Sequence, residues 1–459
     1  MSNIKYMPEE PIVAIATSLS PAALGIVRCS GKNCVSLVSR IFSRKNALLS
    51  AAGNTLVYGW IIDGEKKVDE VMAAVYRAPK SFTGEEMIEI FCHGGSGVVL
   101  AIHNLLLESG FREAERGEFT FRAFVNGKAD LTKSEAVQEI IESRTGEARS
   151  RAAGRLAGNL FSEIDCIKTL IKETIAAIEV EIEYPEDEET IADSFDIHNL
   201  KEASKKLVAL KDSWKGEKLY QDGARVVLCG RTNAGKSSLF NAILKEERAI
   251  VSDIEGTTRD WLESFCDIGG IPVRLFDTAG LRKTDDVVES QGVAISKNLS
   301  EDADIILYLA DASLGLTEED KAFIEHAKKP LVLVWNKCDK CTPNKETPQE
   351  LNKYIKSAVC VSAKTTEGFY ELYQAIQSIL TEGISSECHY AGLGSARQKS
   401  IIDEAYVSVQ HAMEAADTFT LDAVVQDLED ALNLLGEVTG EVTSDDILES
   451  IFSKFCVGK

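Results

Sequence analysis

The residues from Gly230 to Ser238 have the types and spacing that bind the phosphates of a nucleotide. They read Gly-Arg-Thr-Asn-Ala-Gly-Lys-Ser-Ser and follow an apolar run at residues 224–229. The glycines allow backbone angles that a side chain would forbid, Lys236 reaches the β- and γ-phosphates, and Ser237 binds magnesium. The pattern predicts a strand, a phosphate loop and a helix. Taken alone, it could also be an ordinary glycine turn.

Three further elements follow in the order that a guanine-nucleotide domain requires. Residues 277–280 place the Asp277 carboxylate where it can hold magnesium through water, and a glycine amide near the γ-phosphate. Residues 336–339 follow a buried-strand pattern and place Asp339 where it can accept hydrogen bonds from guanine, which adenine cannot donate. The backbone of residues 362–364 can donate to the guanine oxygen. Together the elements predict that the chain binds GTP.

The polar loop at residues 252–260 lies where the first nucleotide switch is expected. Thr258 in this loop is the natural second hydroxyl ligand of magnesium, because one hydroxyl from each side of the γ-phosphate completes the octahedron. Arg259 resembles a catalytic arginine finger, but we expect it to form a local ion pair with Asp260 or Asp253. Its functional role therefore stays open at this point.

The catalytic group for GTP hydrolysis is not the glutamine that orients water in Ras-type enzymes. The residue after Asp-Thr-Ala-Gly is Leu281, whose apolar side chain cannot polarise water. Glu289 is the nearest candidate carboxylate, although from the residues alone a solvated loop charge is the better interpretation.

The residues expected to contact GTP come from all of these segments. They are Asn233, Ala234, Gly235, Lys236, Ser237, Ser238, Ser252, Asp253, Ile254, Glu255, Gly256, Thr257, Thr258, Asp277, Thr278, Ala279, Gly280, Asn336, Lys337, Asp339, Ser362, Ala363 and Lys364.

Composition is that of an ordinary globular protein of two to four domains. The chain has 459 residues, of which 44% are apolar and 27% charged. No segment approaches the roughly 18 to 20 apolar residues of a membrane span, and no signal peptide is evident. Eleven scattered cysteines argue against a disulfide framework. We therefore expect a cytoplasmic protein without a membrane partner. Cys338 and Cys341 have C-x-x-C spacing, but the pair overlaps the guanine motif, and we interpret the spacing as coincidence.

Charge and periodicity divide the chain into four segments. Residues 1–128 carry a net charge of +1 and alternate short strand-like and helical runs, which predicts an α+β domain. Residues 225–380 carry −5 and contain the nucleotide motifs, which predict an α/β domain with a mostly parallel sheet. The flanking residues 129–224 and 381–459 together carry −19 and are helical in pattern. We expect one all-α domain into which the GTPase domain is inserted; two separate helical linkers are the alternative.

Several motifs outside the phosphate loop carry a family resemblance. The Gly-Thr-Thr-Arg-Asp switch, Asn233 and Leu281 resemble the Era, Der and MnmE group of GTPases. Residues 81–86, 93–95 and 117–131 and the terminal Cys-Val-Gly-Lys resemble the MnmE (TrmE) family of tRNA modification GTPases in particular. The resemblance extends from about Ile12 to the last residue.

The resemblance implies a folate site in the N-terminal domain. In this family the domain is similar to tetrahydrofolate-binding proteins and pairs with a second copy, which makes a homodimer that holds formyl- or methylene-tetrahydrofolate. By motif, the folate ligands are Arg28, Glu85, Lys128 and Lys459. The segment before Arg28 is poorer in glycine than is usual in the family. No role is assigned to Cys456, for which a small buried thiol is the alternative.

The resemblance also implies a potassium ion as the missing catalyst. By motif, its ligands are the side chain of Asn233 and oxygens of Ser252, Ile254 and Thr257, and Glu289 orients the attacking water. Two GTPase domains are expected to meet across their nucleotide faces. Thr232 replaces the proline that usually precedes Asn233.

The expected function is that of a GTP hydrolase in tRNA modification. With the flavoprotein MnmG, which brings FAD and forms a heterotetramer with it, the family adds a carboxymethylaminomethyl or aminomethyl group to carbon 5 of the wobble uridine. Because the chain carries a net charge of −23, we expect tRNA to be contacted mainly through that complex. The alternatives are an Era- or Der-like ribosome-assembly GTPase, disfavoured by the acidic C-terminal segment, and a nucleotide-binding scaffold with little hydrolysis.

Overall fold

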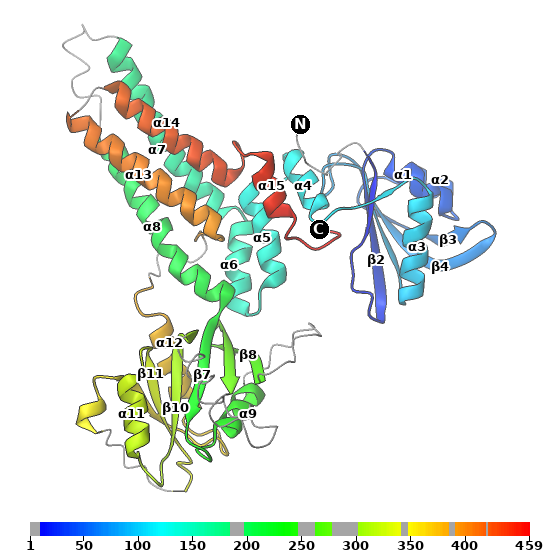
Figure 1. Cartoon of the computed structure of the whole chain (residues 1–459). Coiled ribbons are helices and arrows are strands. Elements are labelled where there is room, and N and C mark those ends of the chain that lie inside the picture. Colours follow the sequence, from blue (N-terminus) through cyan, green and yellow to red (C-terminus); the bar gives the residue numbers. More distant parts are fainter. Residues whose placement is uncertain are drawn as a thin grey trace. The chain divides into compact units, whose positions relative to one another are not determined.

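The computed structural model describes residues 10–183, 197–246, 262–277, 302–340, 348–384, 391–418 and 421–459 (Figure 1). Its contacts divide the chain into two compact units. The first comprises Met1–Gln138, Leu156–Ala203 and Glu404–Lys459, and the second comprises Glu139–Arg155 and Ser204–Asp403. Each unit is therefore assembled from segments that lie far apart in the sequence. The expected domain boundaries at residues 128, 224 and 380 stay predictions.

The first unit contains a mixed sheet of six strands in the order β3-β4-β5-β2-β1-β6. Its strands are β1 (Ile12–Ile15), β2 (Ala22–Ser30), β3 (Thr55–Asp63), β4 (Lys66–Tyr76), β5 (Met87–Gly94) and β6 (Arg112–Glu113). All neighbours are antiparallel except β1 and β6. The strands alternate buried and exposed residues, as a sheet with one covered face requires. The α+β expectation for this region is confirmed.

Helices cover one face of this sheet. They are α1 (Cys34–Val38), the 3-10 helix η1 (Ser39–Ile41), α2 (Lys45–Ser50) and α3 (Ser96–Glu108). Buried side chains such as Val27 and Ile90 of the strands pack with Ile102 and Leu106 of α3 in one core. The opposite face keeps large apolar side chains in solvent, since Leu24 is 60% exposed and Leu56 is 61% exposed.

The end of the chain packs onto the N-terminal segment. The helices α4 (Glu118–Val125) and α15 (Asp445–Phe452) meet through Phe121 and Phe452, whose ring centroids are 5.5 Å apart. A Cβ at Gly117, where φ is 69°, would lie 2.5 Å from the carbonyl oxygen of Phe452. Beyond α15, Val457 forms a β-bridge with Arg116. The C-terminal residues are thus fixed by backbone contacts beside the N-terminal sheet.

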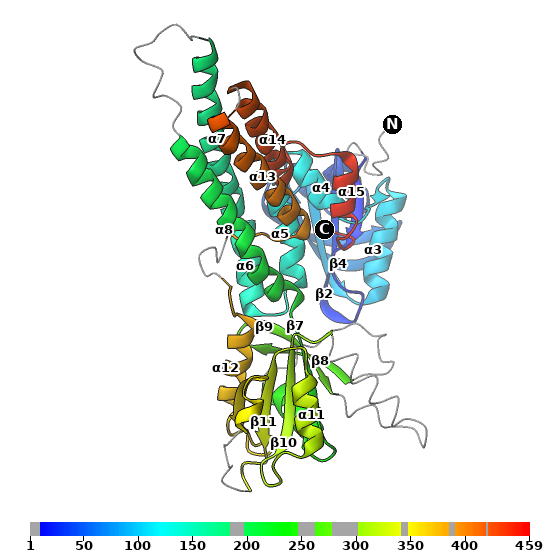
Figure 2. The same ribbon diagram turned by 60° about the vertical axis from the view of Figure 1, so that its left-hand side comes forward.

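Long helices form the rest of the first unit. The helix α7 (Asn159–Glu183) packs along α14 (Leu421–Thr439), as both views show (Figures 1 and 2). Their buried residues recur every three or four positions, for example Ile164, Ile167 and Ile171 in α7. Segments before and after the nucleotide motifs therefore share one apolar core, which fits an inserted domain rather than separate linkers. Within the described residues, no helix is both long and apolar enough to cross a membrane.

A buried ionic network holds helices together in the second unit. Arg155 of α6 (Gly146–Leu156) donates to Glu217 of α8 (Ile197–Asp222) and to Glu139 of α5 (Leu131–Glu142), both at 2.7 Å. Arg151 donates to the other carboxylate oxygen of Glu217, also at 2.7 Å. Burial by itself lowers the pKa of Arg155, but the two glutamates raise it, so the guanidinium stays charged. Glu217 is therefore bound by two arginines away from solvent.

The second unit is built on a sheet with the order β12-β11-β10-β7-β9-β8. Its strands are β7 (Ala224–Gly230), β8 (Leu262–Ile268), β9 (Ile271–Asp277), β10 (Ile305–Asp311), β11 (Leu331–Asn336) and β12 (Ile355–Cys360). All neighbours are parallel except β8 and β9. The mostly parallel sheet expected for the GTPase domain is confirmed.

Helices bury both faces of this second sheet. The helices α9 (Lys236–Glu246) and α12 (Phe369–Leu380) pack on Val226 and Leu228 of β7. The helix α11 (Glu318–His326) and the 3-10 helix η3 (Gln349–Leu351) pack on the other face, where Val227 and Cys229 lie. This double coverage explains the uninterrupted apolar runs of the parallel strands. Among the described residues, a further long helix is α13 (Ala396–Thr418).

The turn between β8 and β9 is tied to the start of α6. Thr145 Oγ1 donates to the carbonyl oxygen of Gly270 at 2.7 Å. Gly270 has a φ of 86°, and a Cβ there would lie 2.9 Å from Cβ of Glu147. The strand β9 ends at Asp277, the carboxylate expected to hold magnesium through water. One hairpin therefore connects the nucleotide edge of the sheet to the helical segment at residues 139–155.

The buried network predicts a strong effect of removing Glu217. We expect Glu217→Ala to lower the free energy of unfolding of the second unit by about 3–5 kcal/mol, because two buried guanidiniums lose the carboxylate that they share. Glu382→Ala removes an exposed ion pair with Lys356 and should cost at most about 1 kcal/mol. Denaturant unfolding followed by circular dichroism checks this difference. Equal losses in the two variants would contradict the interpretation.

Candidate functional site

The phosphate loop lies between β7 and α9, as the motif predicts. Gly230 has a φ of 134° and Gly235 a φ of 98°, in the region that favours glycine. A Cβ at Gly230 would lie 2.3 Å from the carbonyl oxygen of Leu309, and a Cβ at Gly235 would lie 2.2 Å from Nδ2 of Asn336. Both glycines are therefore required by close neighbours as well as by their backbone angles.

The cationic group of the loop points back toward its own backbone. Lys236 Nζ donates to the carbonyl oxygens of Gly230 at 2.7 Å and Arg231 at 2.8 Å. The loop thus encloses an ammonium group beside the first turn of α9, where backbone amides point toward an incoming anion. Ser237 and Ser238 are exposed in that turn. This arrangement suits the phosphates of a nucleotide.

A buried amide joins the phosphate loop to the guanine motifs. Asn336 is only 1% exposed, and its Nδ2 donates to the carbonyl oxygen of Ala234 at 2.8 Å. Its Oδ1 accepts from the backbone N–H of Ala363 at 3.1 Å and of Lys337 at 2.8 Å. The structure therefore brings the phosphate loop, residues 336–339 and residues 362–364 to one edge of the sheet.

The carboxylate expected to recognise guanine is held from one side. Asp339 is exposed, and its Oδ1 accepts from Ser362 Oγ at 2.9 Å. Ser362 is fully buried, whereas Lys364 is exposed. The second oxygen of the carboxylate is positioned by this bond, so Asp339 can present a fixed acceptor to a base.

The carboxylate expected near magnesium ends β9. Asp277 is 4% exposed and pairs in register with Leu228 of β7, two residues before the phosphate loop begins at Gly230. The hydroxyl of Ser237 and the carboxylate of Asp277 are oxygen donors, which fit a hard cation such as magnesium.

Other expected site residues lie outside the described residues, so their roles stay predictions. They are Ser252, Asp253, Ile254, Glu255, Gly256, Thr257, Thr258, Arg259, Thr278, Ala279, Gly280 and Glu289. Asn233 is the one expected potassium ligand that the structure describes; it is exposed and has a φ of 65°.

Asp311 is a residue at this edge that the motifs did not indicate. It ends β10, and its Oδ2 accepts from Lys337 Nζ at 2.7 Å. Its Oδ1 accepts from the N–H and the hydroxyl of Ser313 at 2.9 and 2.6 Å. Burial by itself raises the pKa of Asp311, but Lys337 and Ser313 lower it to about 2, so the group is anionic. Its sequence signal is a carboxylate directly after a buried strand, the same signal that indicated Asp277.

Two of the expected folate ligands, Arg28 and Lys459, lie close together, because the last residues of the chain pack beside β2. Arg28 of β2 donates to Glu89 Oε1 at 2.8 Å and to the carbonyl oxygen of Gly458 at 3.0 Å. Its guanidinium lies 5.6 Å from the ring centroid of Phe119. The bond to Gly458 brings Arg28 close to the neighbouring Lys459. Burial and the charge of Arg28 lower the pKa of Lys459.

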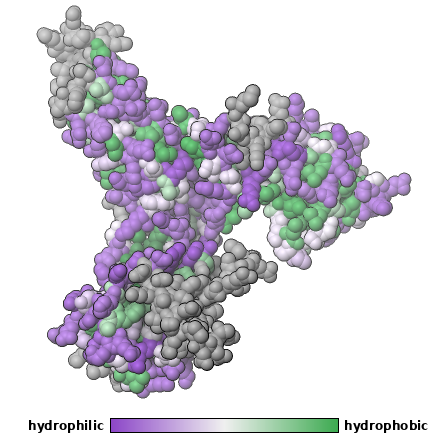
Figure 3. Space-filling model, in the orientation of Figure 1, coloured by the Kyte–Doolittle hydropathy of each residue, from purple (hydrophilic) through white to green (hydrophobic). Residues whose placement is uncertain are grey.

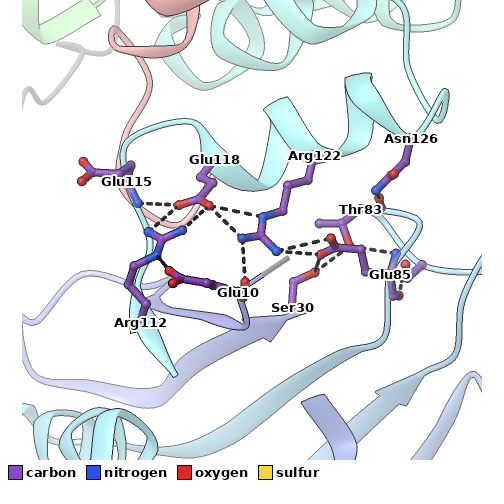
Figure 4. Close-up of polar contacts among 10 residues, drawn as sticks. Glu10, Ser30, Thr83, Glu85, Arg112, Glu115, Glu118, Arg122 and Asn126 are labelled. Carbon is purple, nitrogen blue, oxygen red and sulfur yellow. Dashed lines mark hydrogen bonds and ion pairs between the residues drawn. The ribbon is translucent and has the colours of Figure 1, made fainter. Parts of the chain in front are cut away.

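The third expected ligand, Glu85, belongs to a buried ionic network (Figure 4). Its Oε2 accepts from Ser30 Oγ at 2.7 Å and from Arg122 Nη1 at 3.1 Å. Arg122 also donates to Glu118 at 2.8 Å, and Arg112 donates to Glu118 at 2.7 Å. Burial raises the pKa of Glu118, but the donors from Arg112 and Arg122 and from the backbone lower it overall. Arg122 is only 1% exposed, so a buried guanidinium holds Glu85 in place.

Lys128 and Cys456 complete the expected residues of the N-terminal region. Lys128 Nζ donates to the carbonyl oxygen of Pro79 at 3.1 Å. A Cβ at Gly84 would lie 3.3 Å from Cγ of Lys128. The lysine side chain therefore passes beside Gly84, the residue that precedes Glu85. Cys456 is exposed, so the buried-thiol alternative is wrong.

The uncovered face of the N-terminal sheet contains a cavity that the sequence did not indicate. Its volume is about 470 Å³, and apolar residues such as Leu24, Leu56, Met72 and Phe91 line it. His93 also lines it, and His93 Nδ1 is 2.7 Å from Asp69 Oδ1. Apolar side chains also gather on the surface of this part of the chain in Figure 3.

Comparisons with known proteins follow the same division of the chain. A family model described as the MnmE helical domain matches residues 131–456, and one described as the GTP-binding protein TrmE N-terminus matches residues 11–128.

Two solved structures are similar to a smaller part of the chain. Era of Aquifex aeolicus bound to GDP and aluminium fluoride is 24% identical, with 40% of this chain and 66% of that chain covered and a TM-score of 0.28. The G domain of the Thermotoga maritima FeoB iron transporter is 27% identical, with 34% and 98% covered and a TM-score of 0.25. Neither bears on the assignment.

Curated relatives named tRNA modification GTPase MnmE align along the whole chain. That of Treponema denticola is 52% identical, with 99% of each chain covered. Those of Treponema pallidum and Borrelia turicatae are 44% and 41% identical, with 99% and 100% of each chain covered. These matches confirm the resemblance that the motifs indicated, and the chain belongs to the MnmE family of tRNA modification GTPases.

Proposed function

We propose that this protein is a potassium-dependent GTP hydrolase that acts in tRNA modification. The observation that carries the proposal is the edge of the second sheet, where the buried amide of Asn336 bonds to both the phosphate loop and Ala363. Family membership supports GTP binding and hydrolysis in tRNA modification. The ribosome-assembly alternative has no such support.

GTP binds with its base at Asp339 and its phosphates at Lys236. The Asp339 carboxylate, held by Ser362, accepts the two N–H groups that guanine presents on one edge. An anionic phosphate is a stronger partner for the Lys236 ammonium than the two carbonyl oxygens that it contacts here, so Lys236 turns toward the phosphates. The site therefore selects both the base and the charge of its ligand.

Two cations complete the site in this proposal. Magnesium is held by Ser237 and Thr258, with Asp277 acting through water, and potassium by Asn233 with oxygens of Ser252, Ile254 and Thr257. Bound there, the ions neutralise the negative charge that develops on the phosphates. Glu289 orients the attacking water, because Leu281 cannot do so.

The N-terminal domain binds a reduced folate and a second copy of the chain. Arg28 and Lys459 supply positive charge for the folate carboxylates, and Glu85 and Lys128 supply further polar contacts. The exposed Leu24 and Leu56 and the cavity beside them support a homodimer, because an apolar surface of this kind favours burial against a partner.

The product is a wobble uridine that carries a carboxymethylaminomethyl or aminomethyl group on carbon 5. In this proposal the flavoprotein MnmG contributes FAD and forms a heterotetramer with the dimer, and the folate contributes the one-carbon unit. The net charge of −23 disfavours direct binding to a phosphate backbone, so MnmG contributes most of the tRNA contact. Such an enzyme works in the cytoplasm, where tRNA is modified.

The base-recognition step is tested by Asp339→Asn. We expect its affinity for GTP to fall at least ~100-fold, because the amide keeps one acceptor oxygen, replaces the other by a donor and carries no negative charge. Affinity for xanthosine triphosphate should rise, since xanthine has a carbonyl where guanine has its amino group. Titration with fluorescent nucleotides checks both. Glu350→Gln is the matched control, and unchanged GTP affinity in Asp339→Asn would contradict the assignment.

Potassium dependence is tested by comparing GTP turnover in potassium and in sodium. We expect faster turnover in potassium for the unaltered protein and loss of that difference in Asn233→Ala, which removes the amide ligand. Asn241→Ala changes an exposed asparagine of α9 outside the expected site and should keep the difference. Equal rates in both salts for the unaltered protein would remove the potassium mechanism.

The proposed reaction on tRNA is tested by mass spectrometry of wobble uridines in a deletion strain. We expect the modified uridines to disappear in the deletion and to return with the intact gene. A gene carrying Lys236→Ala should not restore them, because phosphate binding is lost. Unchanged nucleosides in the deletion strain would rule out the proposed function.

A further inference from the structure

Two residues at the nucleotide edge adopt left-handed backbone angles without being glycine. Asn233 in the phosphate loop has a φ of 65°, and Lys337 after β11 has a φ of 67°. Such angles cost free energy in non-glycine residues and persist where surrounding contacts impose them. The contact between them is a hydrogen bond of 2.8 Å from Lys337 Nζ to the carbonyl oxygen of Asn233.

Asp311 fixes the other side of the same ammonium group. Lys337 Nζ lies 2.7 Å from Asp311 Oδ2, and the side chain of Asp311 is only 12% exposed. In the parallel ladder, Asp311 pairs with Asn336 of β11, while Leu309 of the same strand pairs with Gly230 of β7. The carboxylate therefore lies between the strand of the phosphate loop and the strand of the guanine motif.

Asp311 is itself held rigidly. The N–H and hydroxyl of Ser313 donate to its Oδ1, which leaves Oδ2 directed at Lys337. The order of contacts is thus Ser313, Asp311, Lys337 and the Asn233 carbonyl. Each member is fixed by the one before it.

We infer that Asp311 is a positioning residue for the monovalent cation and the nucleotide. It holds Lys337 against the Asn233 carbonyl, which sets the backbone of Asn233 and so directs its side chain toward the cation. This inference rests on the proposed function, because Asn233 is the cation ligand there. Asp311 does not contact the reacting atoms and acts through Lys337.

The charge of Asp311 contributes as well as its position. Lys337 brings a positive charge next to the loop that is proposed to bind potassium, and like charges repel. The carboxylate of Asp311 compensates that charge. An amide at position 311 would keep the shape of the side chain but leave the ammonium uncompensated and less firmly held.

Asp311→Asn tests the inference in the full-length protein. We expect the potassium concentration for half-maximal GTP turnover to rise roughly tenfold, because removing the contacts that orient a metal ligand typically weakens metal binding by at least that factor. The Kd of a fluorescent GTP analogue should rise too. The turnover rate at saturating potassium and GTP should stay close to that of the unaltered protein, a separation that a general loss of structure would not produce.

Asp304→Asn is the matched control. Asp304 precedes the same strand at its other end, where its Oδ2 accepts from the N–H of Arg225 at 2.7 Å. We expect no change in half-saturating potassium or in nucleotide affinity for this variant. If Asp311→Asn also leaves both values unchanged, or if Asp304→Asn shifts them equally, the inference is wrong.

Two further measurements keep the outcome interpretable. If Asp311→Asn does not fold, Ser313→Ala removes one donor to Asp311 and should shift half-saturating potassium in the same direction by less; no shift would overturn the inference. If the unaltered protein hydrolyses GTP equally in sodium and potassium, the proposed function fails. Nucleotide affinity of Asp311→Asn against Asp304→Asn, measured without turnover, then still decides whether Asp311 positions Lys337.

Discussion

The nucleotide edge depends on one buried hydrogen-bonding group, the side-chain amide of Asn336. Its nitrogen bonds to the phosphate loop and its oxygen to the loop that begins at Ser362. A buried amide that loses its partners is costly, so the three loops are held in one arrangement. The close approach of Asn336 also explains Gly235, where any side chain would collide with the amide. Base recognition and phosphate binding are thereby parts of one rigid structure.

Similar constraints act away from the nucleotide. Arg122 links Glu85 to Glu118 in the first unit, and Arg155 links Glu217 to Glu139 in the second. In both networks a buried guanidinium joins elements distant in sequence and keeps its charge because carboxylates surround it. Such networks add less net stability than apolar packing would, but breaking one is costly, so they specify which helices meet. The expected folate ligand Glu85 gains its position from such a network.

Much of the fold and of the nucleotide site could be predicted from local patterns. The phosphate loop, Asn336, Asp339 and Ser362 lie at the ends of apolar runs, and parallel strands bring those ends to one edge. Asp311 occupies an equivalent strand end but belongs to no recognised motif, so the sequence pattern does not indicate its role. The cavity beside Leu24 and the bond from Arg28 to Gly458 could not be predicted, because they join segments whose separation along the chain carries no local signal.

Residue types and spacing at the phosphate loop and at Asp339 suffice to specify GTP as the ligand. The periods of the apolar residues likewise predict the alternation of strands and helices. The position of Lys337 between Asp311 and Asn233, and that of Gly458 beside Arg28, have no local signal and follow from the packing of distant segments. These contacts join residues that are distant in sequence, and their geometry follows from how sheets and helices pack.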